Sequence, residues 1–333
     1  MTNFNPFKDE NFSIFLLLTS LTLTSACTGS NNSKTSTPSH STPSHPTTQI
    51  TPNFTTPGST TPRATSYNGV PDTFERTQID RLKERGLTGR NIVIRLRDET
   101  HPDLRHPLLQ HTRLAYEPIQ TDAYLSGHAL GMALIAAGAP SPQSQEGVAP
   151  EIKIITDEHL AEQNGVNPVI VSDSIDGSNL IMSCDYQMPH QGSNELRPPV
   201  NPPTNIYVVI AGNGGHQNPT NMAWRISPGH IPHWQNIIIT VAVDRNNRLT
   251  STSNACGNTE RFCIGVPSNG TTSETAPIVT GTLALLMEAH PGRPLSDYVN
   301  AILETATPLP NQWETGRGLL NAEAADQYLA HHP

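Results

Sequence analysis

The stretch TTSETAPIVTGTLALL, residues 271–286, places a proline four residues after a serine at the start of an apolar run. Proline has no backbone N–H and is tolerated only in the first turn of a helix, so Pro277 indicates that a helix begins near Ser273. Serine is a common N-cap, and a capping role for Ser273 is one interpretation of this stretch. The second is chemical, because N–H groups and the positive end of a helix beside a serine can stabilise an oxyanion.

Short runs rich in β-branched residues accompany this helix, and each is bounded by Gly, Pro, Asn or Asp. They are NIVIRLRD (91–98), EIKIIT (151–156), NLIMS (179–183), NIYVVIAGN (205–213) and NIIITVAVD (236–244). Runs without polar alternation suit strands covered on both faces, which favours a parallel sheet over a sandwich. Further helices are predicted over 77–86 and 129–137. The expected fold class is therefore α/β, with three layers: a mostly parallel sheet and helices on both faces.

Polar residues stand where several of these strands end, and ligands of such sheets bind beyond the carboxyl ends of the strands. Asp98, Ser183 and Asn213 are at such ends, and His128 lies just ahead of the helix over 129–137. Each is ordinary alone, because Asn is a frequent turn residue and a lone His is usually packed or solvated. Their order is more informative: Asp before His before Ser is the order of the subtilisin triad, and other serine hydrolases use different orders.

At these residues the chain resembles the subtilisin-like serine proteases (subtilases, peptidase family S8), roughly from residue 86 to residue 325. The motifs that carry the resemblance are GLTGRNIVIRLRD followed by HPDL, GHALGMALIAAG, GVAP (147–150), LIMS, VVIAGNGG, TSETAPIVTGTLALLMEAHP and GRGLLNAEAA. No single motif is decisive, but together they follow one another in the order of the family. The fold that the resemblance implies is the subtilisin-like α/β sheet.

The resemblance also implies roles for individual residues. Ser273 corresponds to the nucleophile, His128 to the general base and acid, and Asp98 to the carboxylate that orients the histidine. Asn213 corresponds to the side-chain donor to the oxyanion. The substrate cleft would be lined by Ser183, Cys184, Asp185 and Gly212, along which an extended peptide can pair as an added strand.

Several positions depart from the family pattern. Ala129 and Leu130 stand where Gly-Thr usually follows the histidine, and the loop between Asp98 and HPDL is shortened. If this shortening dismantles the triad, Asp98 will point away from His128. Arg95 and Arg97 lie on a strand that is normally buried, so each needs a partner or an opening to solvent.

The turn before the serine departs as well, because Thr271 stands where the family has glycine. A positive φ at a β-branched residue would store about 1 to 3 kcal/mol of strain. We expect Gly270, one position earlier, to absorb that conformation if the turn requires it.

The N-terminal part of the chain differs in composition from the rest. FSIFLLLTSLTLTSAC, ending at Cys27, is apolar but short for a membrane span, which predicts a signal peptide over 1–27. Ser25 and Ala26 before Cys27 resemble a bacterial lipobox, which implies lipidation of Cys27. The alternatives are a secretory signal cleaved elsewhere or a disordered N-terminus. The Ser/Thr/Pro-rich residues 28–72 predict a disordered tether, and 73–333 are expected to form the peptidase domain.

Two of the four cysteines lie close together just before the serine motif, at Cys256 and Cys263. In an exported protein this spacing predicts a short disulfide loop and leaves Cys184 over. Such a loop resembles the subtilase passengers of Gram-negative autotransporters, although we expect no autotransporter β-barrel in this protein. We expect an exported protein, on the outer membrane or cell surface as a lipoprotein, or otherwise periplasmic or secreted.

The expected function is that of a serine endopeptidase acting by acyl transfer on a polypeptide substrate, as a monomer. The alternative is a binding or assembly lipoprotein on a degenerate scaffold, because a fold does not guarantee an activity. The net charge of −9 and the lack of a basic patch exclude nucleic acid as a partner. A third hypothesis, a metal protein using His216, His230 and His233, lacks paired ligand spacing. No cofactor is expected, and calcium is left unassigned although Asp103 resembles a ligand position.

Overall fold

The computed structural model describes residues 72–98, 100–114, 125–142, 145–155, 164–166, 168–174, 205–219 and 236–332. Six parallel strands within these ranges form one sheet, in the spatial order β2-β1-β3-β4-β5-β6. The strands are β1 (Val93–Arg97), β2 (Lys153–Ile155), β3 (Ile170–Asp173), β4 (Ile206–Ile210), β5 (Ile237–Val243) and β6 (Cys263–Pro267). The predicted α/β fold with a parallel sheet is confirmed.

The runs predicted around β1, β2, β4 and β5 are strands, whereas β3 and β6 were not predicted. β3 is only four residues long and β6 contains a glycine, so neither produces a long apolar run. The predicted strand over 179–183 lies outside the described residues.

Helices cover the sheet and continue the chain to its C-terminal end. They are α1 (Thr73–Arg76), α2 (Ile79–Glu84), α3 (Gly127–Ala137), α6 (Thr275–Ala289), α7 (Leu295–Glu304), α8 (Gln312–Thr315) and α9 (Ala322–His331). The described part of the chain also contains the short 3₁₀ turns η1 (Gln110–Thr112), η4 (Gly257–Phe262) and η5 (Thr272–Glu274). The helix predicted over 77–86 is α2, which is separated from α1 because Gln78 adopts a left-handed conformation with φ 56°.

Both faces of the central strands are buried, as the apolar runs predicted. Ile238 packs with the helices in the larger core cluster, while Ile237, Ile239 and Val241 pack in a second cluster that includes Cys256 and Cys263. Neighbouring residues of one strand thus belong to different cores, because side chains alternate across a sheet.

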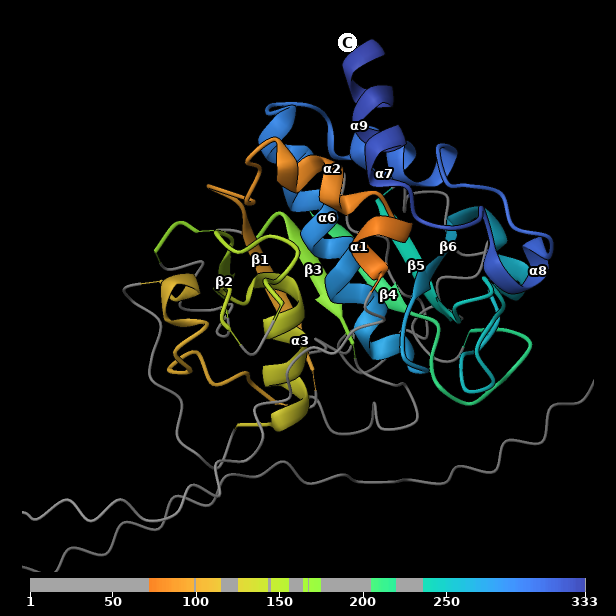
Figure 1. Cartoon of the computed structure of the whole chain (residues 1–333), viewed down its shortest axis with the longest axis horizontal. Helices are drawn as coiled ribbons and strands as arrows, with labels where there is room; N and C mark the ends of the chain where they lie inside the picture. Colours follow the sequence, from red (N-terminus) through yellow and green to blue (C-terminus); the bar gives the residue numbers. More distant parts are fainter. Residues whose placement is uncertain are drawn as a thin grey trace, which may run out of the picture. The chain divides into compact units, whose positions relative to one another are not determined.

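The helix α6 occupies the centre of the larger core. It contacts β3, β4, β5 and β6 as well as α3, and Figure 1 shows it lying across the sheet. Every residue from Thr275 to Met287 is buried. Gly281 permits this close packing, because a Cβ at that position would lie 2.5 Å from the Cβ of Val148.

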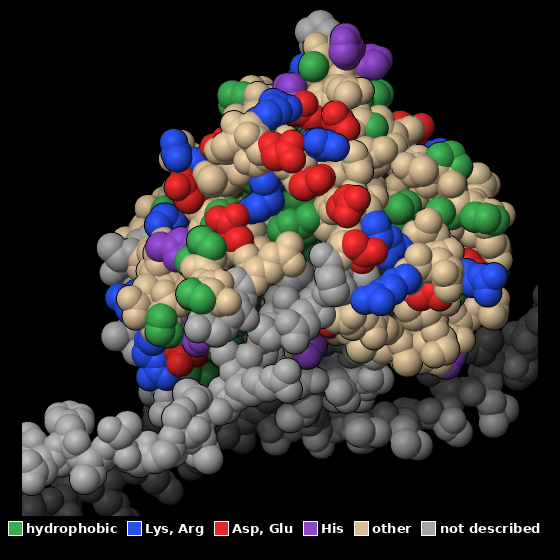
Figure 2. All heavy atoms as spheres, in the orientation of Figure 1, with side chains coloured by type: hydrophobic (Ala, Val, Ile, Leu, Met, Phe, Trp, Pro, Cys, Tyr) green, Lys and Arg blue, Asp and Glu red, His purple; other side chains and the backbone are tan. Residues whose placement is uncertain are grey.

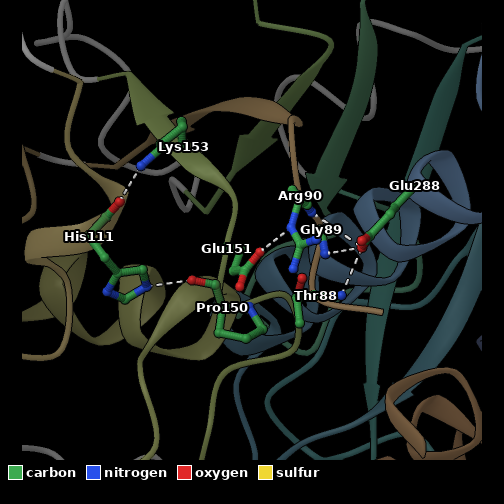
Figure 3. Close-up of polar contacts among 8 residues, drawn as sticks. All are labelled: Thr88, Gly89, Arg90, His111, Pro150, Glu151, Lys153 and Glu288. Carbon is green, nitrogen blue, oxygen red and sulfur yellow. Dashed lines mark hydrogen bonds and ion pairs between the residues drawn. The ribbon is translucent and has the colours of Figure 1, made fainter. Parts of the chain in front are cut away.

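The C-terminal end of α6 is anchored to the loop that leads into β1 (Figure 3). One carboxylate oxygen of Glu288 accepts hydrogen bonds from the backbone N–H groups of Thr88, Gly89 and Arg90, at 2.7, 2.6 and 3.2 Å. Gly89 has a φ of +78°, and a Cβ there would lie 2.6 Å from Ile152. Position 89 therefore accepts only glycine, and the Glu288 carboxylate provides the hydrogen-bond acceptor for three backbone N–H groups.

The same region is joined to its neighbours by further polar contacts, also drawn in Figure 3. Arg90 pairs with Glu151 at 2.7 Å, and Lys153 donates to the carbonyl oxygen of His111 at 2.5 Å. The ring of His111 contacts the carbonyl oxygen of Pro150. These bonds hold η1 and the start of β2 against the beginning of β1.

The surface carries charges of both signs. Figure 2 shows Lys and Arg side chains interspersed with Asp and Glu on the face drawn, with no extended field of one sign. Within the described part of the chain, no helix combines the length and apolar composition needed to cross a bilayer.

Candidate active site

Asp98 and His128 meet at the carboxyl edge of the sheet. Asp98 directly follows β1, and His128 is the second residue of α3. The Nδ1 atom of His128 lies 2.9 Å from Oδ1 and 2.8 Å from Oδ2 of Asp98. A carboxylate can only accept there, so Nδ1 carries a proton and Nε2 of the neutral ring is the atom that can accept one. The shortened loop after Asp98 therefore leaves this pair intact.

The side chains of Asp98 and His128 differ in their exposure to solvent. The side chain of Asp98 is 2% exposed, whereas that of His128 is 42% exposed. Ser126 caps α3, because its hydroxyl accepts hydrogen bonds from the backbone N–H of His128 and of Ala129. The replacement of Gly-Thr by Ala129-Leu130 leaves this first turn regular, and the imidazole remains open to the surface beside a buried carboxylate.

Ser273 lies in η5, immediately before α6, and is 5% exposed. Because α3 contacts η5, the helix of His128 and the turn of Ser273 are neighbours. The interpretation of Ser273 as the cap of α6 is wrong: the capping position is occupied by Glu274, and Pro277 is the third residue of the helix. The 3₁₀ turn intervenes, and the Thr275 hydroxyl donates to the carbonyl oxygen of Thr272 at 2.5 Å.

The altered turn before the serine is unstrained at threonine. Gly270 has a φ of +136°, while Thr271 is extended at φ −111° and ψ 149°. The expectation that Gly270 absorbs the unusual conformation is confirmed. Ser268 stabilises this turn. Its hydroxyl lies 2.6 Å from the Thr271 carbonyl oxygen and 2.9 Å from a carboxylate oxygen of Glu274, within hydrogen-bond distance of both.

Asn213 follows β4 and reaches toward the serine turn. Its Oδ1 atom accepts hydrogen bonds from the backbone N–H of Thr272 at 2.7 Å and from the Thr272 hydroxyl at 2.9 Å. A backbone N–H can only donate, so the amide orientation is set, and the Nδ2 group lies on the side away from these donors. Thr272, whose contact with Asn213 was not predicted from the sequence, therefore orients the Asn213 side chain.

The strand between β1 and β4 is β3, and its end contributes residues that the sequence analysis missed. The hydroxyl of Ser174 donates to the carbonyl oxygen of Ser273 at 3.2 Å. Asp173 lies opposite Arg97 in the register of β3 and β1, and their side chains form an ion pair of 3.4 Å. The run PVIVSDS (168–174) carried the signal, because it is β-branched and ends in polar residues as NLIMS does.

This ion pair supplies the partner that a buried Arg97 was expected to need. The side chains of Arg97 and Asp173 are only 9% and 5% exposed. Arg95 on the same strand is also buried, at 8% exposure. Burial of two charges is costly, and the attraction between them offsets that cost only while both are present.

Replacing Arg97 with leucine is expected to lower the free energy of unfolding by about 3 to 5 kcal/mol, because it deprives a buried carboxylate of its guanidinium. The double variant Arg97→Leu with Asp173→Leu should recover most of this loss. Urea unfolding measures both. Arg81→Leu, in the exposed pair with Glu84, is the control and should leave stability nearly unchanged. A double variant as unstable as the single one would contradict the expectation.

Among the other site residues predicted from the sequence, Gly212 lies beside Asn213 with a φ of +103°. Ser183, Cys184, Asp185 and Cys27 lie outside the described residues, as do His230 and His233. Cys256 and Cys263 form a disulfide with an S–S length of 2.03 Å and a Cα–Cα distance of 5.8 Å. This bond joins the two ends of η4 at the start of β6.

The described residues contain no group of three or more His, Cys, Asp or Glu side chains that could hold a metal ion. The carboxylate of Asp103 is engaged instead by Arg105, whose Nε and Nη2 atoms lie 2.7 and 3.0 Å from its two oxygens. This side-chain hydrogen bonding lowers the pKa of Asp103.

Comparison with known proteins matches the chain to one family. The sequence model of the subtilase family matches residues 90–322. Subtilisin DY of Bacillus licheniformis is 26% identical over 284 residues, covering 78% of this chain and 99% of that protein. Serotype-specific antigen 1 of Mannheimia haemolytica is 26% identical over 198 residues, covering 52% of this chain and 21% of that protein.

Solved structures share the fold. The prenylagaramide maturation protease PagA superposes with a TM-score of 0.52 at 20% identity, covering 75% of this chain and 98% of that chain. A serine protease of Aeromonas sobria gives a TM-score of 0.54 at 14% identity, covering 74% and 62%.

Proposed function

The chain belongs to the subtilase family and is a serine endopeptidase, and from this premise we propose that Asp98, His128 and Ser273 form its catalytic triad. The observation that supports the proposal most directly is the bond between the buried Asp98 carboxylate and Nδ1 of His128, beside the turn of Ser273. This arrangement leaves Nε2 as the proton acceptor for a serine hydroxyl.

In the proposed reaction the Ser273 oxygen attacks the carbonyl carbon of a peptide bond while His128 takes its proton. The tetrahedral intermediate collapses when His128 returns the proton to the leaving amine, which leaves an acyl-enzyme. Water, activated by the same histidine, then releases the acid and restores the serine. Asp98 holds the ring and stabilises its protonated form during both steps.

The negative charge that develops on the carbonyl oxygen needs donors that are already in place. We propose that Nδ2 of Asn213 and the backbone N–H of Ser273 supply them. The bonds from Thr272 to Oδ1 support this role, because they fix the orientation of the amide before substrate arrives.

The substrate is a polypeptide, and we propose that it binds in extended form along Gly212 and along Ser183, Cys184 and Asp185. The carboxylate of Asp185 would favour basic or polar substrate side chains. We further propose that residues 1–27 direct export, that Cys27 carries a lipid anchor, and that residues 28–72 tether a monomeric peptidase domain to a bacterial outer membrane or cell surface.

A fluorophosphonate probe tests the proposed chemistry, because it phosphonylates only an activated serine. We expect the purified protein to be labelled and the Ser273→Ala variant not to be. Ser251→Ala, an exposed serine between β5 and η4, is the matched control and should be labelled like the parent. Folded protein that is never labelled, or labelling that survives Ser273→Ala, would favour a binding or assembly protein on a degenerate scaffold.

A further inference from the structure

The turn that presents Asn213 has little rigidity of its own. Asn213 is flanked by Gly212 on one side and by Gly214 and Gly215 on the other, and two of these glycines have positive φ angles, +103° and +65°. Glycine restricts the backbone less than any other residue, so such a turn loses much conformational freedom when it is fixed. Contacts from elsewhere in the chain must therefore hold it.

Asn254 makes those contacts from a segment about 40 residues further along the chain. Its Oδ1 atom accepts from the backbone N–H of Gly214 at 3.0 Å and of His216 at 2.8 Å. Its Nδ2 group donates to the carbonyl oxygen of Ala211 at 2.8 Å, and its own N–H donates to that of Gly212 at 2.8 Å. A single side chain thus bonds to the backbone on both sides of Asn213.

Because Asn254 is buried, its hydrogen bonds hold the backbone of the glycine-rich turn firmly in place. Asn254 is 0% exposed, so a backbone group that lost its partner there could not turn to water instead. Two backbone bonds extend the contact: Gly215 N–H donates to Thr252 at 2.9 Å, and Ala255 N–H donates to His216 at 2.8 Å. The segment 252–255 therefore runs along the turn, and it belongs to the longer segment 250–256.

The same segment also holds the serine turn. The hydroxyls of Thr250 and Thr252 both donate to the carbonyl oxygen of Gly270, the former at 3.0 Å. Asn254 is two residues from Cys256, which is fixed by its disulfide. One segment thus contacts the turn of Asn213 and the turn of Ser273, which Thr272 joins directly.

We propose that Asn254 is a positioning residue for the oxyanion site: it holds the glycine-rich turn so that the amide of Asn213 faces the substrate carbonyl. The inference rests on the proposed function, because it assigns Asn254 to the same reaction. In this role Asn254 acts on the reaction through Asn213 and is not itself a catalytic residue.

Kinetics of the full chain test the coupling. We expect Asn254→Ala to lower kcat about 100-fold with KM little changed, the scale of a displacement of about 1 Å in a catalytic group. Asn213→Ala should cost roughly 100- to 1,000-fold. In the Asn213→Ala background, the Asn254 substitution should cost nothing more, because the group it positions is gone. Additive losses would overturn the proposal. Asn258→Ala, at an exposed asparagine four residues further along the chain, is the control expected to keep full activity.

Asn254→Asp covers the case in which the alanine variant fails to fold. It keeps the acceptor for Gly214 and His216 but replaces the donor to Ala211 with a second carboxylate oxygen, which repels the Ala211 carbonyl oxygen, so its kcat should fall below that of the parent. The kcat of this variant relative to the parent is the measured outcome, and an aspartate variant with the parent's kcat would contradict the role of the Ala211 bond.

Amide hydrogen exchange separates this inference from the proposed function, because it needs no activity. The N–H of Thr272 bonds to Asn213 and not to Asn254. If Asn254 positions Asn213, the exchange of Thr272 should speed up in Asn254→Asp or Asn254→Ala while the buried amides of α6 stay protected. Unchanged exchange at Thr272 would overturn the inference even in an active enzyme. If the parent protein itself has no peptidase activity but Thr272 still exchanges faster in the Asn254 variants, the coupling is upheld and the proposed function is refuted.

Discussion

The variant His128→Ala is expected to hydrolyse a fluorogenic peptide with a kcat on the order of a million-fold below that of the parent, the scale known for subtilisin. The imidazole is the only group of the proposed triad that both accepts and returns a proton. The Asp98 carboxylate then loses its partner and faces solvent where the exposed ring stood. Steady-state kinetics with saturating substrate measure the effect.

The double variant His128→Ala with Ser273→Ala sharpens this test. Residues that act as one unit are not additive, so the double variant should be no slower than either single one. His331→Ala, at the exposed end of α9, is the control for losing a histidine and should retain the parent kcat. Losses that multiply would show that the two residues do not share one reaction step.

The second large effect is expected for Asp98→Asn, which should lower kcat roughly ten thousand-fold. Asparagine keeps the shape of the side chain but presents an NH₂ group to Nδ1 of His128. The ring proton then resides on Nε2, and the ring can no longer accept the proton of the serine. The fold should persist, because an uncharged amide replaces a buried carboxylate of the same size.

Thermal unfolding and kinetics together check this prediction. Asp297→Asn on α7, whose side chain is 37% exposed, provides the matched control and should alter neither quantity. An Asp98→Asn variant with nearly full kcat would mean that the bond between Asp98 and His128 does not set the tautomer.

The strands and helices that consist of one apolar run with clear ends could be predicted from the sequence. β1, β4, β5 and α3 follow from apolar runs with clear ends, and Pro277 indicated the start of α6 to within a few residues. The pairing of Asp98 with His128 was inferred from the order Asp, His, Ser along the chain and from the resemblance to the subtilases that this order carries.

What escaped prediction depends on contacts across the chain. β3 is too short to be distinguished from other β-branched runs, so Asp173 and Ser174 were missed although the strand lies beside β1. The 3₁₀ turn at Ser273 was not predicted, because the start of the helix was placed at Ser273 itself and a serine is common at that position. The bonds of Asn254 join residues about 40 positions apart, and nothing in either segment alone indicates them.

The burial of α6 has a consequence for how activity would be lost. The turn of Ser273 is continuous with a helix that is buried from Thr275 to Met287, and Glu288 secures the far end of that helix. Local fraying cannot displace such a helix, because it opens only when the core around it opens. Heat inactivation should therefore follow the cooperative melting of the whole domain, with no earlier stage in which a folded protein has a misplaced serine.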